Sequence, residues 1–164
     1  MSRLVALSAL ILFQVLLSNS LQAADKYQIV TTTGMISDNV AQVAGQRADV
    51  VNLIGSNIDP HLYKLTRSDV AKLMQADVVF YNGLLLEGKM IDALKRVLAA
   101  GKKVYALAEL LSEDELLSTE EFAGVFDPHL WMDPLVWSKA VGFIRDMLAE
   151  FDVDARDYYY TNAL

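Results

Sequence analysis

The fold is decided by a β-branched run near the N-terminus, Tyr27-Gln28-Ile29-Val30-Thr31-Thr32-Thr33-Gly34. Its first six residues favour a strand, and Thr33-Gly34 turns the chain into a helical stretch over residues 35–44. The pattern returns further along, where Val78-Val79-Phe80-Tyr81 predicts a strand and Asn82-Gly83 a turn into a helix over residues 84–100. Both segments therefore predict a buried strand that is followed at once by a helix.

Two further strands are expected between and after these segments. Residues 49–54 predict a strand that leads into a long loop containing Pro60, and residues 103–106 predict the last strand. Thr66 and Asp69 have the spacing of a capping box and predict the start of a short helix. Four strands that alternate with helices predict an α/β fold, a parallel-sheet lobe flanked by helices. Functional sites in such sheets lie beyond the carboxyl ends of the strands.

The C-terminal third of the sequence adds a loop and a long helix. Residues 107–126 are acidic and predict a helical turn within a solvated loop. Pro134 opens a strongly amphipathic helix that extends to Phe151, and another helix is expected after Asp152. The helical pattern is still running at Leu164, so we expect the chain to be truncated.

The N-terminus predicts export from the cytoplasm. Arg3 precedes an apolar stretch from Leu4 to Leu17 and a small-residue region that ends at Ala24, which is the layout of a cleavable signal peptide. A membrane anchor is the alternative, but an apolar core of roughly 14 residues is short for a span that needs about 20. We expect residues 1–24 to be a signal peptide and the mature chain to begin near Asp25.

Composition narrows the compartment and the function classes. The chain has no cysteine, so neither disulfides nor an N-terminal lipid are expected, and a free periplasmic protein is favoured over a lipid-anchored surface protein. The net charge of −7 gives no reason to expect nucleic acid as a partner. Glycine-rich nucleotide loops and a Gly-x-Ser-x-Gly elbow are both absent from the sequence, which argues against nucleotide binding and a serine hydrolase.

One tetrapeptide occurs twice and contains both histidines of the chain. It appears as Asp59-Pro60-His61-Leu62 and as Asp127-Pro128-His129-Leu130. A lone loop histidine usually packs or forms hydrogen bonds, but duplication in an identical context favours a pair of ligands at one rim of the sheet. Neutral imidazole binds zinc, manganese or iron, and a carboxylate can hold its second nitrogen. Asp59 and Asp127 are candidates for that role, with Asp133 behind them.

The quoted residues resemble a known family, the metal-binding solute receptors of bacterial ABC importers for manganese, zinc and iron. The resemblance covers nearly the whole predicted mature chain. It rests on both Asp-Pro-His motifs and on Val30-Thr31-Thr32-Thr33-Gly34-Met35, Ser68-Asp69, Ala76-Asp77-Val78, Tyr81-Asn82-Gly83 with Leu86-Glu87, and Trp131-Met132-Asp133-Pro134. It implies that His61 and His129 are metal ligands, and it implies no other site residue here.

The resemblance also implies an architecture and partners. Members have two α/β lobes joined by a long helix, so residues 25–133 are expected to be the N-terminal lobe and residues 134–164 the start of the interlobe helix. The remaining ligands, typically a histidine or glutamate and an aspartate, come from the second lobe. We therefore expect weak metal binding by this chain, a monomeric state, no enzymatic activity, and delivery of the ion to an ABC permease in the inner membrane.

The metal and two other functions stay open at this point. Zinc-specific members often carry a histidine-rich acidic loop, whereas residues 107–126 have acids and no histidine, which favours Mn²⁺ or Fe²⁺ over Zn²⁺. A metal-dependent hydrolase is one alternative, but no general base is spaced for it. A surface adhesin of the same family is the other alternative, and the missing lipidation cysteine argues against it.

Overall fold

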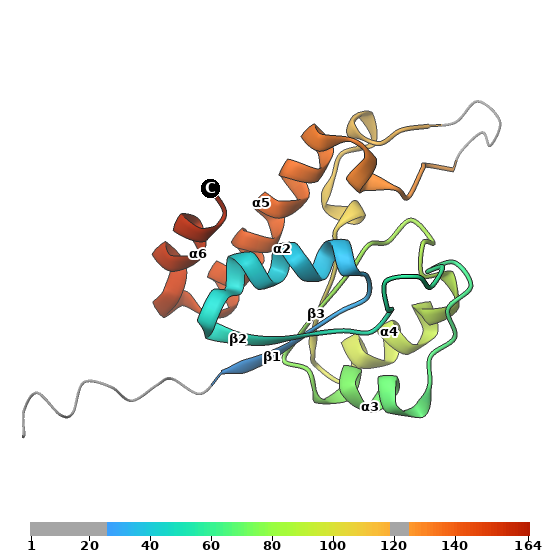
Figure 1. The fold of residues 1–164 in the computed structure, drawn as a ribbon, viewed down its shortest axis with the longest axis horizontal. Helices are drawn as coiled ribbons and strands as arrows, with labels where there is room; N and C mark the ends of the chain where they lie inside the picture. Colours follow the sequence, from blue (N-terminus) through green and yellow to red (C-terminus); the bar gives the residue numbers. More distant parts are fainter. Residues whose placement is uncertain (1–25, 119–124) are drawn as a thin grey trace, which may run out of the picture.

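The centre of the protein is a parallel sheet, seen in a computed structural model that describes residues 26–118 and 125–164 (Figure 1). The sheet has four strands in the order β2-β1-β3-β4. Their bounds are β1 (Tyr27–Thr31), β2 (Ala48–Asn52), β3 (Val78–Tyr81) and β4 (Lys103–Ala106). The predicted α/β fold is therefore confirmed, whereas the predicted signal peptide lies outside the described residues.

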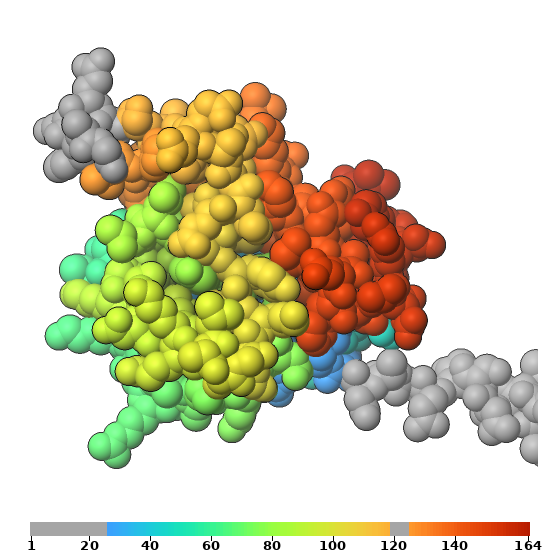
Figure 2. Space-filling view, turned by 180° about the vertical axis from the view of Figure 1, so that it is seen from behind, coloured from blue at the N-terminus to red at the C-terminus, as the bar shows by residue number. Residues whose placement is uncertain are grey.

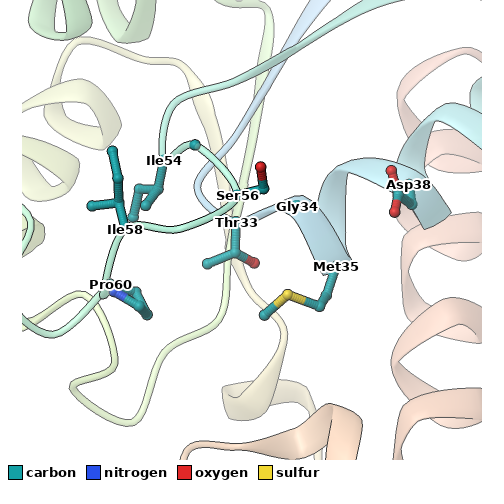
Figure 3. Close-up of a pocket in the computed structure, with 9 residues that line it drawn as sticks. Thr33, Gly34, Met35, Asp38, Ile54, Ser56, Ile58 and Pro60 are labelled. Atoms are coloured by element: carbon teal, nitrogen blue, oxygen red, sulfur yellow. The ribbon is translucent and has the colours of Figure 1, made fainter.

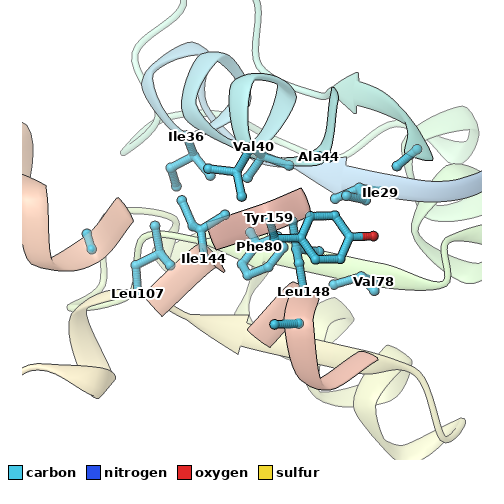
Figure 4. Close-up of a cluster of buried hydrophobic side chains, with 14 of the residues drawn as sticks. Ile29, Ile36, Val40, Ala44, Val78, Phe80, Leu107, Ile144, Leu148 and Tyr159 are labelled. Atoms are coloured by element: carbon cyan, nitrogen blue, oxygen red, sulfur yellow. The ribbon is translucent and has the colours of Figure 1, made fainter. Parts of the chain in front are cut away.

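Helices cover both faces of the sheet (Figure 1). One face carries α2 (Gly34–Ala44), α5 (Pro134–Phe151) and α6 (Arg156–Asn162), and the other carries α3 (Arg67–Gln75) and α4 (Ile91–Ala99). Successive residues of a strand point to opposite faces. Ile29 accordingly packs in the cluster under α2 and α5, which Figure 4 shows, and Val30 packs against α3 and α4. Burial on both faces explains why β3, Val78-Val79-Phe80-Tyr81, is continuously apolar.

The strand order creates a switch point between β1 and β3. The chain leaves β1 for β2 on one side and later enters β3 on the other side, so the helices that follow these strands diverge from this point. Open α/β sheets bind ligands at such a point, beyond the carboxyl ends of the strands. Thr32 and Asn82 directly follow β1 and β3 there, and both are fully buried.

The expected helix over residues 84–100 is wrong at its start. Leu84 and Leu85 have φ values of +49° and +63°, and regular helix begins only at Ile91, after the 3₁₀ turn η3 (Gly88–Met90). The irregular turn directs the side chain of Glu87 into the protein, where it is fully buried. Helical periodicity cannot reveal such a turn, because Leu86 and Met90 are buried as they would be on a helix face.

Other local predictions are confirmed. Thr66 and Asp69 form the expected capping box at the start of α3. The acidic segment contains the short turns η4 (Ala108–Leu110) and η5 (Glu113–Glu115), and its residues 119–124 lie outside the described part. In Figure 2 the segment after β4, in yellow, lies against α5 in orange-red.

The C-terminal helices complete the core beneath α2. Ala140, Ile144 and Leu148 of α5 are fully buried in the cluster that also holds Ile29. Tyr159 of α6 is buried, and its hydroxyl lies 2.8 Å from that of Tyr27 and donates to Asp152 at 2.6 Å. These contacts fix α5 and α6 to the sheet. The described part of the chain contains no helix with the length and apolar character needed to cross a membrane.

Removing side-chain volume from α5 should destabilise the lobe. We expect Ile144→Ala to lower the free energy of unfolding by about 2–5 kcal/mol, because a fully buried side chain leaves a cavity. Leu135→Ala on the same helix is the control, since Leu135 is 79% exposed and should change stability by less than about 0.5 kcal/mol. Urea unfolding followed by circular dichroism measures both, and equal stability of the two variants would show that α5 does not pack as described.

Candidate metal centre

His61 lies in the loop that follows β2. The backbone N–H of Ile54 donates to the carbonyl of Thr32 at 2.9 Å, which holds the start of the loop beside the end of β1. The Asp59 carboxylate accepts the backbone N–H of His61 at 2.9 Å. Beyond the histidine, the Tyr63 hydroxyl donates to the buried carboxylate of Asp69 in the first turn of α3, at 2.8 Å. The loop is therefore anchored on both sides of His61.

His129 lies in the segment between β4 and α5, and it is held more tightly. Its backbone N–H donates to Oδ1 of Asp127 at 2.9 Å, and its Nδ1 lies 2.5 Å from the same oxygen. The buried side chain of Asn82 donates to the carbonyl of Pro128 at 2.8 Å, which ties the motif to the end of β3. Trp131 packs edge-on against the imidazole. Ring and backbone are thus both restrained.

The two imidazoles meet although 68 residues separate them. Their Nε2 atoms are 3.4 Å apart at the exposed surface, and the ring planes are inclined at 61°. Zinc–nitrogen bonds of about 2.0–2.1 Å at a tetrahedral angle put two nitrogens roughly 3.3–3.4 Å apart. The separation therefore suits two nitrogens that share one metal ion. The structure brings together both histidines that the sequence selects.

The three aspartates considered as imidazole partners have different roles. Asp127 contacts Nδ1 of His129, so the ring donates its Nδ1–H there and keeps the Nε2 lone pair free for a metal. The backbone and ring N–H groups of His129 lower the pKa of Asp127, which keeps this carboxylate ionised. The Asp59 carboxylate accepts the backbone N–H of His61 and does not reach the ring, and the Asp133 carboxylate caps α5 by accepting the backbone N–H groups of Leu135 and Val136. The expectation for Asp59 and Asp133 is therefore wrong.

The described residues supply an incomplete ligand set. Within residues 26–118 and 125–164, no group of three or more His, Asp or Glu side chains is placed to hold a metal ion. Two imidazoles fill only half of a tetrahedral shell. Among the described residues, the arrangement offers two imidazole nitrogens that can bind an ion, and no third imidazole or carboxylate is grouped with them.

A cavity lined in part by Pro60, the residue before His61, lies beside the candidate metal centre. It encloses about 330 Å³ between the start of α2 and the loop after β2. Figure 3 shows Thr33 and Met35 on one side and Ile54, Ile58 and Pro60 on the other. Its surface is largely apolar, and Asp38 is the one carboxylate that lines it. The cavity therefore offers no ligand set for a metal.

Two residues that hold the histidine loops are given no such role by the sequence alone. The sequence pattern makes Asn82 a turn former and Glu87 part of a helix, yet Asn82 holds the His129 loop and Glu87 holds Asn82. Glu87 Oε1 accepts from the Asn82 backbone at 2.8 Å. Burial raises the pKa of Glu87, although N–H and O–H donors oppose the shift. The signal in the sequence is the presence of both residues in the segments that carry the family resemblance, which implies no role for either of them.

Comparisons with known proteins agree with this geometry. The family model described as the periplasmic component A of the zinc-uptake complex, ZnuA, matches residues 29–164. The manganese-binding lipoprotein MntA of Bacillus subtilis is 37% identical over 141 residues, which cover 86% of this chain and 45% of that protein. The zinc-binding protein TroA of Treponema pallidum is 40% identical over 129 residues, which cover 78% of this chain and 41% of that protein.

Solved structures give the same picture. The periplasmic zinc-binding protein TroA from Treponema pallidum superposes with a TM-score of 0.79 at 35% identity, over 85% of this chain and 49% of that one. Fe(III)-bound YtgA from Chlamydia trachomatis gives 0.73 at 30% identity, over 84% and 48%. The chain thus spans less than half the length of these relatives and corresponds to half of their fold. It belongs to the ZnuA family of periplasmic metal-binding proteins of ABC transporters, a family of transport components and not of enzymes.

Proposed function

We propose that this chain captures a divalent transition-metal ion between His61 and His129, as the binding component of an ABC importer. The observation that carries the proposal is the 3.4 Å separation of the two Nε2 atoms, because it brings the two histidines of the sequence to one metal-sized site. Family membership supports metal transport in general. We propose in addition that His61 and His129 are the ligands and that the ion is delivered to an inner-membrane permease.

The proposal includes compartment and organisation. Residues 1–24 are a cleavable signal peptide, the mature chain is a periplasmic monomer, and residues 25–133 are the lobe that holds the two histidines. Residues 134–164 begin the connection between lobes, with α5 and α6 packed on the sheet at the start of that connection. The remaining ligands come from outside the described residues. Two exposed imidazoles alone explain why this chain should bind its ion weakly.

Two observations bear on which ion is carried. The acidic stretch 107–126 has no histidine, which favours manganese, with iron as an alternative. The 3.4 Å separation equals that of two nitrogens on tetrahedral zinc, and zinc binds nitrogen ligands more tightly than manganese does. We propose manganese as the physiological ion and keep zinc as the second candidate, because selectivity depends on ligands beyond these two.

Metal titration tests the site. We expect calorimetry of the purified chain to show one weak site, with a dissociation constant in the micromolar range or above, since two imidazoles form half a shell. His61→Ala and His129→Ala should each weaken binding so far that calorimetry no longer detects it, leaving at most a single-histidine contact that NMR can follow, whereas Lys102→Ala, remote from the centre, should leave binding unchanged. Binding that survives both histidine changes, or submicromolar affinity in the unmodified chain, would contradict the proposal.

Two aspartates in identical motifs provide a matched comparison. We expect Asp127→Asn to weaken zinc binding by about 10–100-fold, because the neutral amide orients and polarises the His129 ring less well than a carboxylate. Asp59→Asn should have a much smaller effect, since an amide oxygen can still accept the backbone N–H of His61. Equal losses in the two variants would mean that both aspartates act only on the loop backbone.

Competition between metals tests the choice of ion. With only two nitrogen ligands, the chain should bind zinc more tightly than manganese, as the general affinity order requires. If manganese is the cargo, a protein extended by the second lobe, which carries the remaining ligands, should show a smaller difference between its zinc and manganese affinities. Calorimetric displacement of manganese by zinc, before and after the second lobe is added, measures the change. An unchanged or larger preference for zinc would favour zinc as the cargo.

A further inference from the structure

The switch point between β1 and β3 is filled by a carboxylate that metal capture does not use directly. Glu87 is fully buried, and it accepts hydrogen bonds from the Thr32 hydroxyl at 2.6 Å, the Asn82 backbone at 2.8 Å and the Gly83 backbone at 3.2 Å. Within residues 26–118 and 125–164, no lysine or arginine forms an ion pair with it. Its three partners are therefore neutral groups from the ends of two strands.

Both histidine loops are attached to the partners of Glu87. On one side, the carbonyl of Thr32 accepts the N–H of Ile54, where the chain leaves β2 toward His61. On the other side, the side chain of Asn82 donates to the carbonyl of Pro128, the residue before His129. One carboxylate thus connects the two loops through short chains of buried hydrogen bonds.

A buried carboxylate is a costly way to fill a core. Removing an ionised carboxyl from water costs several kcal/mol, and hydrogen bonds to neutral donors offset only part of that cost. An acid does, however, offer two oxygens that only accept when ionised, whereas glutamine offers one acceptor and one donor. In a Glu87→Gln variant the new NH₂ group would face an N–H or O–H donor, so a glutamine cannot hold both strand ends in the same way.

We infer that Glu87 is the positioning residue that sets the distance between the two metal-binding imidazoles. It acts through Thr32 on the His61 loop and through Asn82 on the His129 loop, and it does not contact the ion. The inference rests on the proposed function, because it assumes that one ion bridges His61 and His129. A residue that serves folding alone would affect stability without changing how well the two rings act together.

The test compares zinc binding in two backgrounds. In the unmodified chain, Glu87→Gln should weaken zinc binding at least about tenfold while circular dichroism shows the chain still folded. In a His129→Ala background, where only His61 remains to bind zinc, Glu87→Gln should have no effect, because a single ring has no partner distance to lose. Glu113→Gln is the control, since it makes the same chemical change at an exposed position. Zinc affinity is measured by calorimetry and, for the weak single-histidine sites, by NMR of ¹⁵N-labelled histidine.

The outcomes separate the two proposals. If zinc binds as tightly after both histidines are replaced as it does before, the proposed function fails. If full zinc affinity needs both histidines but Glu87→Gln binds as tightly as the unmodified chain, or if Glu87→Gln loses the same factor in the His129→Ala background, the positioning role is overturned.

If Glu87→Gln does not fold, a second variant tests the same positioning role. Thr32→Val replaces one hydroxyl by a methyl group of similar size and removes one of the three donors to Glu87. It should weaken zinc binding severalfold in the two-histidine chain and leave single-histidine binding unchanged. Zinc binding by Thr32→Val as tight as that of the unmodified chain would overturn the positioning role.

Discussion

The proposed metal centre depends on one geometric constraint, which is that loops from the two edge strands of the sheet must meet above its middle. His61 follows β2 and His129 follows β4, and these strands lie at opposite edges of the order β2-β1-β3-β4. Their Nε2 atoms can be 3.4 Å apart only because both loops bend back over the ends of β1 and β3. Thr32 and Asn82 at those two ends hold the loops, and buried Glu87 joins them.

The two Asp-Pro-His motifs are alike in sequence, but they are held by different contacts in the structure. Each Asp-Pro-His segment uses its aspartate to accept the backbone N–H of its own histidine, so the loop conformation is shared. Only Asp127 also reaches the imidazole, and only the second motif is tied to the sheet by a side chain, that of Asn82. The imidazole of His129 is therefore better restrained than that of His61. The His61 loop is held on either side by the hydrogen bonds from Ile54 to Thr32 and from Tyr63 to Asp69, and neither of them reaches the ring.

Much of the fold could be predicted from the sequence, because strands, helix caps and amphipathic helices depend on residues that are close together in the chain. The four strands, the capping box at Thr66 and the helix from Pro134 to Phe151 were expected and are present. Duplication of a four-residue motif identified the two histidines. The turn at residues 84–87 could not be predicted, since Leu84 and Leu85 adopt positive φ without a glycine. The network around Glu87 joins residues up to 55 positions apart, and no local pattern reports such contacts.

The central claim is that both imidazoles bind the same ion through Nε2, and it can be tested directly because the chain has only two histidines. The measurement is long-range ¹H–¹⁵N NMR of the histidine-labelled chain as zinc, a diamagnetic probe, is added. We predict that both Nε2 resonances shift together at one equivalent of zinc, while Nδ1 of His129 stays protonated against Asp127. A shift of one ring alone, or of neither ring while zinc is bound, would contradict this account.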